Sequence, residues 1–176
     1  MKVRYIYSAC IEICTKDVRI LTDPWFTDGV YDGSWYQFPK IEDPLSIITE
    51  PDLIYISHIH PDHYDPVFLK KLFDKWGEKP VLIPDFKRNY LYLRSQFDGI
   101  KTTPTNKETY GDTTIEIVPN ITGSISDIDS ALFVNDGKHR VLNLNDCAWY
   151  DDHVALLRAL TKSQDQPIDL VALGYT

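Results

Sequence analysis

A cluster of metal-type side chains constrains the fold of this chain more than any other feature. It reads Ser57-His58-Ile59-His60-Pro61-Asp62-His63, so three imidazoles and one carboxylate fall within six positions. The apolar run Asp52–Ser57 predicts a short strand covered on both faces. Asp65–Trp76 predicts a helix, because Asp65 suits the N-cap and Pro66 suits the first helical position. Its predicted apolar stripe comprises Val67, Leu69, Leu72, Phe73 and Trp76. We therefore expect the cluster on a loop between a buried strand and a helix.

The residue types in this cluster favour a transition-metal site. Imidazole and carboxylate together select zinc, iron or manganese over calcium or magnesium. A single histidine is usually an ordinary core or surface residue, but four metal-type side chains at this spacing point to a functional site. The predicted ligands are His58, His60, Asp62 and His63.

The rest of the sequence predicts strands mixed with helices. The expected strands are Val3–Tyr7, Ala9–Cys14, Val18–Leu21, Pro80–Pro84, Thr113–Val118, Ala131–Asn135, Arg140–Asn145 and Ile168–Leu173. The expected helices are Asp65–Trp76, Lys87–Phe97 and Asp152–Thr161. Between Asp23 and Pro44 lies a long aromatic loop, a feature typical of functional or lid-like segments. The pattern predicts one α/β (α+β) domain over residues 1–176, with a mixed sheet covered by helices.

Charge and cysteine content narrow the partners. A formal net charge of −8 gives no electrostatic support for general nucleic-acid binding or for anionic membranes. No apolar run approaches the ~20 residues of a membrane span, and no signal peptide is recognisable. Three cysteines, Cys10, Cys14 and Cys147, suit reduced thiols better than a disulfide framework. We expect a cytoplasmic protein with a small-molecule substrate.

The cluster resembles the signature His-x-His-x-Asp-His of the metallo-β-lactamase superfamily, and the match is complete from His58 to His63. The resemblance implies an αββα sandwich. It also implies that His58 and His60 serve a first metal, and that Asp62 and His63 serve a second. The family has a bridging aspartate at the end of a later strand, where this chain has Asp146 after Val141–Asn145. The alternative for Asp146 is a turn or helix-capping role.

A narrower resemblance covers nearly the whole chain. The segments Ala9–Glu12, Ile20–Trp25, Asp52–His58, Asp129-Ser130 and Val141–Cys147 look, in that order, like the metallo-β-lactamase domain of cytidine-monophosphate N-acetylneuraminic acid hydroxylases and their bacterial relatives. Those hydroxylases also carry an iron–sulfur Rieske module with two Cys/His pairs, which this sequence lacks. An electron-transfer hydroxylase acting alone is therefore disfavoured.

Two departures from the superfamily pattern concern the ligand set. The third histidine of the first metal should fall between Val118 and Asp129, where no histidine occurs; Asp127 or Asp129 could substitute through an oxygen. The final histidine should follow Ile168–Leu173, yet the sequence ends at Thr176. We therefore expect a sandwich missing part of its C-terminal half, completed by a longer chain or in a homodimer.

Other polar residues receive lesser roles. His139 and His153 are expected on the surface, and Cys147 is expected to pack rather than to bind metal. Asp23 ends a strand before Pro24-Trp25; it either faces the site, as the resemblance implies, or caps the strand.

Metal-dependent hydrolysis of an ester, amide or phosphodiester is the leading functional hypothesis. Zinc, with two ions, is the expected cofactor, and iron or manganese are the alternatives. Asp62 is the predicted catalytic residue, because it would orient the attacking hydroxide. The resemblance supports this reading at His60, where the iron-redox branch has Glu.

Two other hypotheses compete with hydrolysis. The first is a degenerate domain that binds a metal or an anionic ligand without turnover, and the missing third histidine favours it. The second is an iron-dependent hydroxylase component with a separate Rieske partner. In each case Trp25, Trp35 and Phe38 are expected to form an aromatic wall over the cleft, although packing would explain these aromatics equally well.

Overall fold

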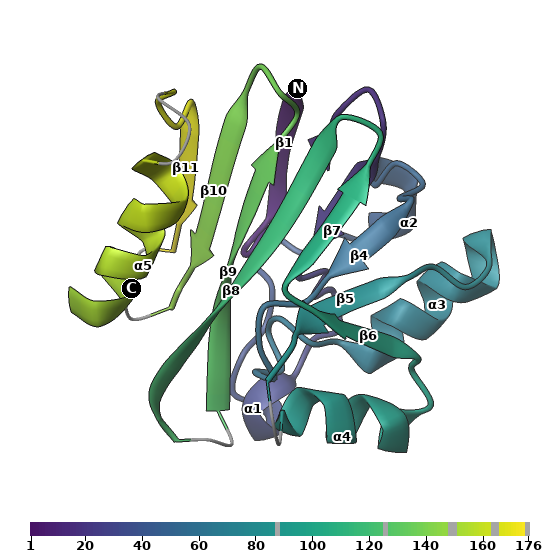
Figure 1. Ribbon diagram of the computed structural model, residues 1–176. Helices are drawn as coiled ribbons and strands as arrows, with labels where there is room; N and C mark the ends of the chain where they lie inside the picture. Colours follow the sequence, from purple (N-terminus) through teal and green to yellow (C-terminus); the bar gives the residue numbers. More distant parts are fainter. Residues whose placement is uncertain (87–88, 125–126, 148–150, 163–165, 175–176) are drawn as a thin grey trace.

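Two β-sheets face each other in this chain, and helices cover the outer face of each (Figure 1). The computed structural model describes residues 1–86, 89–124, 127–147, 151–162 and 166–174. In spatial order, the first sheet contains β1 (Lys2–Tyr7), β2 (Cys10–Cys14), β3 (Arg19–Thr22), β4 (Leu53–Tyr55), β5 (Val81–Pro84) and β6 (Thr102–Thr105). The second contains β11 (Leu170–Leu173), β10 (Arg140–Asn145), β9 (Asp127–Asn135), β8 (Thr113–Ser124) and β7 (Lys107–Tyr110). The helices are α1 (Val30–Gly33), α2 (Pro44–Ile47), α3 (Pro66–Trp76), α4 (Tyr90–Asp98) and α5 (Asp151–Lys162).

Three layers of apolar side chains hold this arrangement together. The middle layer lies between the sheets and includes Ile13, Tyr55 and Leu132. A second layer joins the outer face of the first sheet to α3 and α4, and a third joins the outer face of the second sheet to α5. Each sheet thus buries both faces, as the layer rule requires of a sheet with two apolar surfaces. The predicted αββα sandwich is confirmed.

Helix α3 forms where the sequence predicts it. The Asp65 side chain caps its first turn by accepting a hydrogen bond from the Phe68 amide, and Pro66 occupies the first helical position. The predicted apolar stripe needs one correction: Val67 is 50% exposed, whereas Phe68 is buried beside Leu69. At about 100° per residue, Val67 lies roughly 200° around the helix from Leu69 and so faces away from the sheet.

The strand directions bring distant segments to one edge. Strands β3, β4, β5 and β6 run parallel to one another, so their carboxyl ends meet at the same edge of the first sheet. Strand β3 ends at Thr22, immediately before Asp23, and β4 ends two residues before Ser57. The carboxyl end of parallel strands is where open α/β sheets place their ligands. Asp23 and the histidine cluster are therefore neighbours.

Some elements differ from the sequence-based expectation. Strands β8 and β9 are longer than predicted and pair from Thr114 and Asn135 to Ser124 and Asp127. Strands β6 and β7 were missed, because their threonines, lysine and proline give no apolar run; pairing with β5 and β8 defines them instead. Helix α4 begins at Tyr90, where the Asn89 side chain caps it. Its predicted start at Lys87 lies outside the described residues.

Two further expectations concern the state of the cysteines and membrane-spanning segments. The three cysteines are free thiols, as predicted, and Cys10 and Cys147 are buried. Among the residues that the structure describes, we find no helix with the length and apolar character needed to cross a membrane.

Asp65 offers a test of how the long aromatic loop is held. Besides capping α3, its carboxylate accepts hydrogen bonds from the Phe26 amide at 3.0 Å and from the Thr27 amide at 2.8 Å. We expect Asp65→Ala to lower the free energy of unfolding by about 2–3 kcal/mol, since it leaves the buried Phe68 amide and the partly buried Phe26 and Thr27 amides without their acceptor. Urea denaturation measures this. The exposed Asp74→Ala is the control and should change it by less than about 0.5 kcal/mol; similar losses in both variants would contradict the anchoring role.

Candidate metal centre

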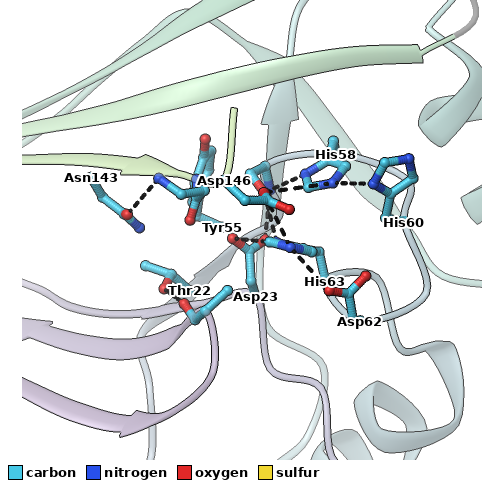
Figure 2. Close-up of polar contacts among 12 residues, drawn as sticks. Thr22, Asp23, Tyr55, His58, His60, Asp62, His63, Asn143 and Asp146 are labelled. Carbon is cyan, nitrogen blue, oxygen red and sulfur yellow. Dashed lines mark hydrogen bonds and ion pairs between the residues drawn. The ribbon is translucent and has the colours of Figure 1, made fainter. Parts of the chain in front are cut away.

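The loop after β4 turns tightly so that its polar side chains converge. The His60 carbonyl accepts hydrogen bonds from the amides of His63 at 2.9 Å and Tyr64 at 2.8 Å. This turn places His58, His60, Asp62 and His63 around one point (Figure 2). Asp146 reaches the same point from the end of β10 in the other sheet. The site thus lies where the carboxyl ends of strands from both sheets meet.

The candidate ligand atoms form two pairs with one aspartate between them. In the first pair, His58 Nε2 lies 2.8 Å from His60 Nδ1. In the second, His63 Nε2 lies 3.5 Å from Asp62 Oδ2. The Asp146 Oδ1 atom lies 3.9 Å from His58 Nε2 and 3.3 Å from His63 Nε2. One ligand atom each from His58, His63 and Asp146 fall within 4.8 Å of one another.

The Asp146 carboxylate lies between one ring of each pair, those of His58 and His63. This is the position that the family resemblance predicts for a bridging aspartate. The Asp146 side chain points at the two rings, which argues against a purely capping role. The assignment of these five residues as metal ligands stays a prediction.

The Nδ1 atoms of His58 and His63 have polar partners that are separate from the contacts of their Nε2 atoms. Ser57 Oγ lies 2.9 Å from His58 Nδ1 and 3.3 Å from His63 Nδ1. Asp23 Oδ2 also lies 3.3 Å from His63 Nδ1, while its Oδ1 accepts a hydrogen bond from the Ser57 amide at 2.7 Å. Such partners set the ring orientation and the tautomer of a metal-binding histidine. Asp23 therefore faces the site, which was one of the two roles expected for it.

Burial and nearby charges shift the pKa values of His58 and His63 in opposite directions. Burial is the main cause that lowers the pKa of His58 to about 2, so this ring is neutral. Burial also lowers the pKa of His63, but its contacts with Asp146 and Asp23 outweigh burial and raise that pKa to about 10. For Asp146, the contact with His63 outweighs burial and holds the pKa of the carboxyl below its ordinary range. Without a metal, a protonated His63 thus balances the surrounding carboxylates.

One of the two suggested substitute ligands lies close to the cluster. Asp129 Oδ1 is 3.9 Å from His58 Nδ1. Its role as a metal ligand stays a prediction. The Asp127 side chain, the other suggested substitute, lies outside the described residues.

His139 and Cys147 are not among the side chains that converge at the described site. His139 lies near Asp136 and the amino group of Met1. The His153 side chain lies outside the described residues. Cys147 is buried, its Sγ lies 3.5 Å from the Ser130 carbonyl, and burial raises the pKa of its thiol well above the ordinary value. It packs, as expected, and is not placed as a thiolate ligand.

Sequence reasoning missed Tyr31 as a functional candidate. Its hydroxyl donates a hydrogen bond of 2.7 Å to Asp62 Oδ1, and its ring lies against that of Trp35. Tyr31 and the adjacent Asp32 both have left-handed backbone angles, with φ of 53° and 56°. Bulky residues rarely adopt such angles, and strained residues concentrate at functional sites. No sequence pattern announces this contact, since it joins residues 31 positions apart.

A cavity of about 640 Å³ opens beside the site. Its lining includes Asp62, His63 and Asp146 together with Tyr5 and Trp35. The expected aromatic wall of Trp25, Trp35 and Phe38 is thus only partly right. Trp25 is buried and bonds to the Thr27 carbonyl, whereas Phe38 is 92% exposed, and neither lines the described cavity.

Comparisons with known proteins agree on the fold. The sequence profile of the family described as "Beta-lactamase superfamily domain" matches residues 2–143. The inactive cytidine monophosphate-N-acetylneuraminic acid hydroxylase of Homo sapiens is 27% identical over 153 residues, which cover 84% of this chain but 30% of that protein. The chain therefore spans under a third of this curated relative.

Two solved structures are similar in fold. An isothiocyanate hydrolase from Delia radicum gut bacteria superposes with a TM-score of 0.68 at 16% identity, covering 90% of this chain and 67% of that one. CmlA, a diiron β-hydroxylase from Streptomyces venezuelae, superposes with a TM-score of 0.60 at 17% identity, covering 95% of this chain and 33% of that one. At these identities the likeness shows a shared fold.

The charge state of His63 predicts a proton release on metal binding. A metal ligand must be a neutral imidazole, so Zn²⁺ must displace the proton that His63 keeps up to a pKa of about 10. His58, with its pKa lowered to about 2, has no proton to lose at neutral pH. Calorimetric titration with Zn²⁺ at pH 7.5, in PIPES and in Tris, counts released protons. We expect His63→Gln to release about one proton fewer than the unmodified protein; equal release would refute the assignment.

Proposed function

The chain belongs to the β-lactamase superfamily domain family, and on this basis we propose that it is a metal-dependent hydrolase of small molecules with an ester, amide or phosphodiester bond. One observation carries the proposal. Asp146 Oδ1 lies 3.9 Å from His58, the partner of His60, and 3.3 Å from His63, the partner of Asp62. That order of atoms suits two ions that share one carboxylate.

The residues present fit zinc. Three imidazoles with two carboxylates are nitrogen and oxygen ligands of the kind that zinc binds in catalytic sites, and the same set accepts iron or manganese. His58 Nε2 and His60 Nδ1 would hold one ion, Asp62 and His63 the other, and Asp146 both. Ser57 and Asp23 supply the outer hydrogen bonds that such rings need.

A bound metal pair would supply a water of lowered pKa and polarise a carbonyl or phosphoryl oxygen. The chain's own residues do the rest. Asp62 holds and orients the attacking water, and the Tyr31 hydroxyl fixes the Asp62 carboxylate from behind. Asp23 keeps His63 in one orientation. The cavity beside Asp62 and Asp146 receives the substrate.

Two observations keep other functions in play. The sequence has no histidine between Val118 and Asp129, which favours a domain that binds ligands without turnover. The similarity to a hydroxylase and to a diiron enzyme favours an iron-dependent oxygenase component with a separate Rieske partner. The curated relative is over three times longer than the part that matches this chain, so an oxygenase activity would belong to a larger assembly.

Elemental analysis of protein purified without added metal separates these functions. We expect about two zinc ions per chain, together with hydrolysis of a p-nitrophenyl ester or of bis-p-nitrophenyl phosphate that a chelator abolishes. Protein that binds no metal and hydrolyses neither compound would be a binding domain. Iron in place of zinc, with redox activity and no hydrolysis, would support the oxygenase.

Asp62 and Asp23 should differ in their effect on activity. Asp62→Asn keeps the side-chain shape but removes the charge that holds metal and water, whereas Asp23 acts through His63. We expect Asp23→Asn to lower kcat/KM by roughly 10- to 100-fold, as is typical of an outer partner, and Asp62→Asn to lower it further. Both are measured at matched metal occupancy. Equal defects would overturn this division of roles.

A further inference from the structure

A short exposed turn in the long aromatic loop reaches toward the metal-type residues. It closes on itself at its base, where the Gly29 amide donates to the Trp35 carbonyl at 2.9 Å and the Trp35 amide donates to the Val30 carbonyl at 3.0 Å. Residues 31–36 of this turn are exposed. A segment with so little buried surface has low local stability of its own. Its position therefore depends on contacts with the rest of the chain.

Two residues of this turn have a backbone conformation that their side chains disfavour. Tyr31 has φ 53° and ψ 55°, and Asp32 has φ 56° and ψ 38°, both in the left-handed region. Residues other than glycine lose conformational energy in this region and keep such angles where surrounding contacts hold them. For Tyr31, one such contact is the 2.7 Å hydrogen bond that its hydroxyl donates to Asp62 Oδ1. This bond links the exposed turn to the loop that carries the histidines.

The two oxygens of Asp62 have different neighbours. Oδ1 accepts the hydrogen bond from Tyr31, whereas Oδ2 lies 3.5 Å from His63 Nε2, and Figure 2 shows the carboxylate beside that ring. Carboxylates that bind a metal are themselves commonly oriented by hydrogen bonds from outer partners. The Tyr31 hydroxyl therefore determines which oxygen Asp62 presents beside His63.

The Tyr31 ring also contacts the wall of the cavity. Its centroid lies 4.9 Å from that of Trp35, with the ring planes tilted by 55°, which is a favourable distance for an aromatic pair. Trp35 is 50% exposed and lines the cavity together with Asp62 and His63. A path of two contacts thus runs from Asp62 through Tyr31 to the cavity wall.

We propose that Tyr31 is a positioning residue that couples metal binding at Asp62 and His63 to the place of Trp35 in the cavity. A bound metal fixes the Asp62 carboxylate, which holds Tyr31, and Tyr31 in turn holds Trp35. Coupling of this kind is reciprocal, so the contact that metal binding strengthens also strengthens metal binding by the same factor. That a substrate meets Trp35 rests on the proposed hydrolase function, whereas the coupling requires only that the site binds a metal.

Zinc affinity tests the first half of this coupling. Tyr31→Phe removes the hydroxyl but keeps the ring that packs on Trp35, and competition with a chromophoric chelator measures the stepwise zinc dissociation constants. We expect one constant to rise roughly 10- to 100-fold, as is typical when a metal ligand loses an outer partner. The control, Tyr36→Phe, removes a hydroxyl from the same exposed turn at a residue outside the described cavity lining. It should change each constant by less than about twofold.

The ¹⁹F NMR signal of Trp35 tests the second half. The protein contains four tryptophans, so it is labelled with 5-fluorotryptophan and the Trp35→Phe variant identifies the Trp35 signal. We expect Zn²⁺ to shift this signal in the unmodified protein and in Tyr36→Phe, but not in Tyr31→Phe at matched zinc saturation. A shift caused only by the charge of a nearby ion would persist in Tyr31→Phe, so the variant separates the two causes.

The outcomes separate this coupling from the proposed function. Unchanged zinc constants in Tyr31→Phe, or a Trp35 shift that persists in it, would each overturn the coupling. A Trp35 response that depends on Tyr31, without hydrolysis of either p-nitrophenyl compound, would keep the coupling and remove the hydrolase. Hydrolysis by a protein in which Tyr31→Phe and Tyr36→Phe bind zinc equally well would do the reverse. Protein that binds no zinc would overturn both.

Discussion

A short chain of buried hydrogen bonds centred on Ser130 holds the two sheets together at the site. The Tyr55 hydroxyl, at the end of β4, donates to Ser130, and Ser130 Oγ donates to the Ser57 carbonyl at 2.8 Å. The Ser130 carbonyl also lies 3.4 Å from Asn145 Nδ2 on β10. One residue of β9 thereby fixes both the start of the histidine loop and the end of the strand that carries Asp146. The distances between ligands from different sheets depend on this link, because apolar packing alone sets no such register.

The charge balance of the site depends on how closely its carboxylates approach its imidazole rings. Asp23, Asp62, Asp129 and Asp146 approach the rings of His58 and His63, and the Asp23 carboxyl is fully buried. Burial is the main cause that raises the pKa of Asp23, with His63 acting against it. So many carboxylates in one place are stable only with positive charge between them. A protonated His63 supplies part of that charge, and metal ions would supply more. The site is thus built to favour cations at its centre.

The sequence and the structure agree most closely where the signal is local. The run from His58 to His63, the buried strand before it and the capped helix after it all follow from neighbouring residues, and they stand as expected. The errors share a different cause. Val67, Trp25 and Phe38 were assigned by residue type, but their exposure depends on which way the helix or loop faces its neighbours. Strands β6 and β7 depend on their pairing partners, which local composition does not reveal.

The sequence by itself determined the set of metal-type residues and a mixed sheet covered by helices, because spacing along the chain and apolar periodicity are local properties. The αββα layers were expected because the run from His58 to His63 resembles the superfamily signature. It also pointed to Asp146, through its place at a strand end. Only the tertiary structure decided which atoms face one another: that Asp146 lies between the rings of His58 and His63, that Asp129 approaches His58 Nδ1, and that the Tyr31 hydroxyl bonds to Asp62. The physical reason is that these contacts cross between sheets and loops, where sheet register and the turn at residues 60–63, rather than spacing along the chain, set the distances.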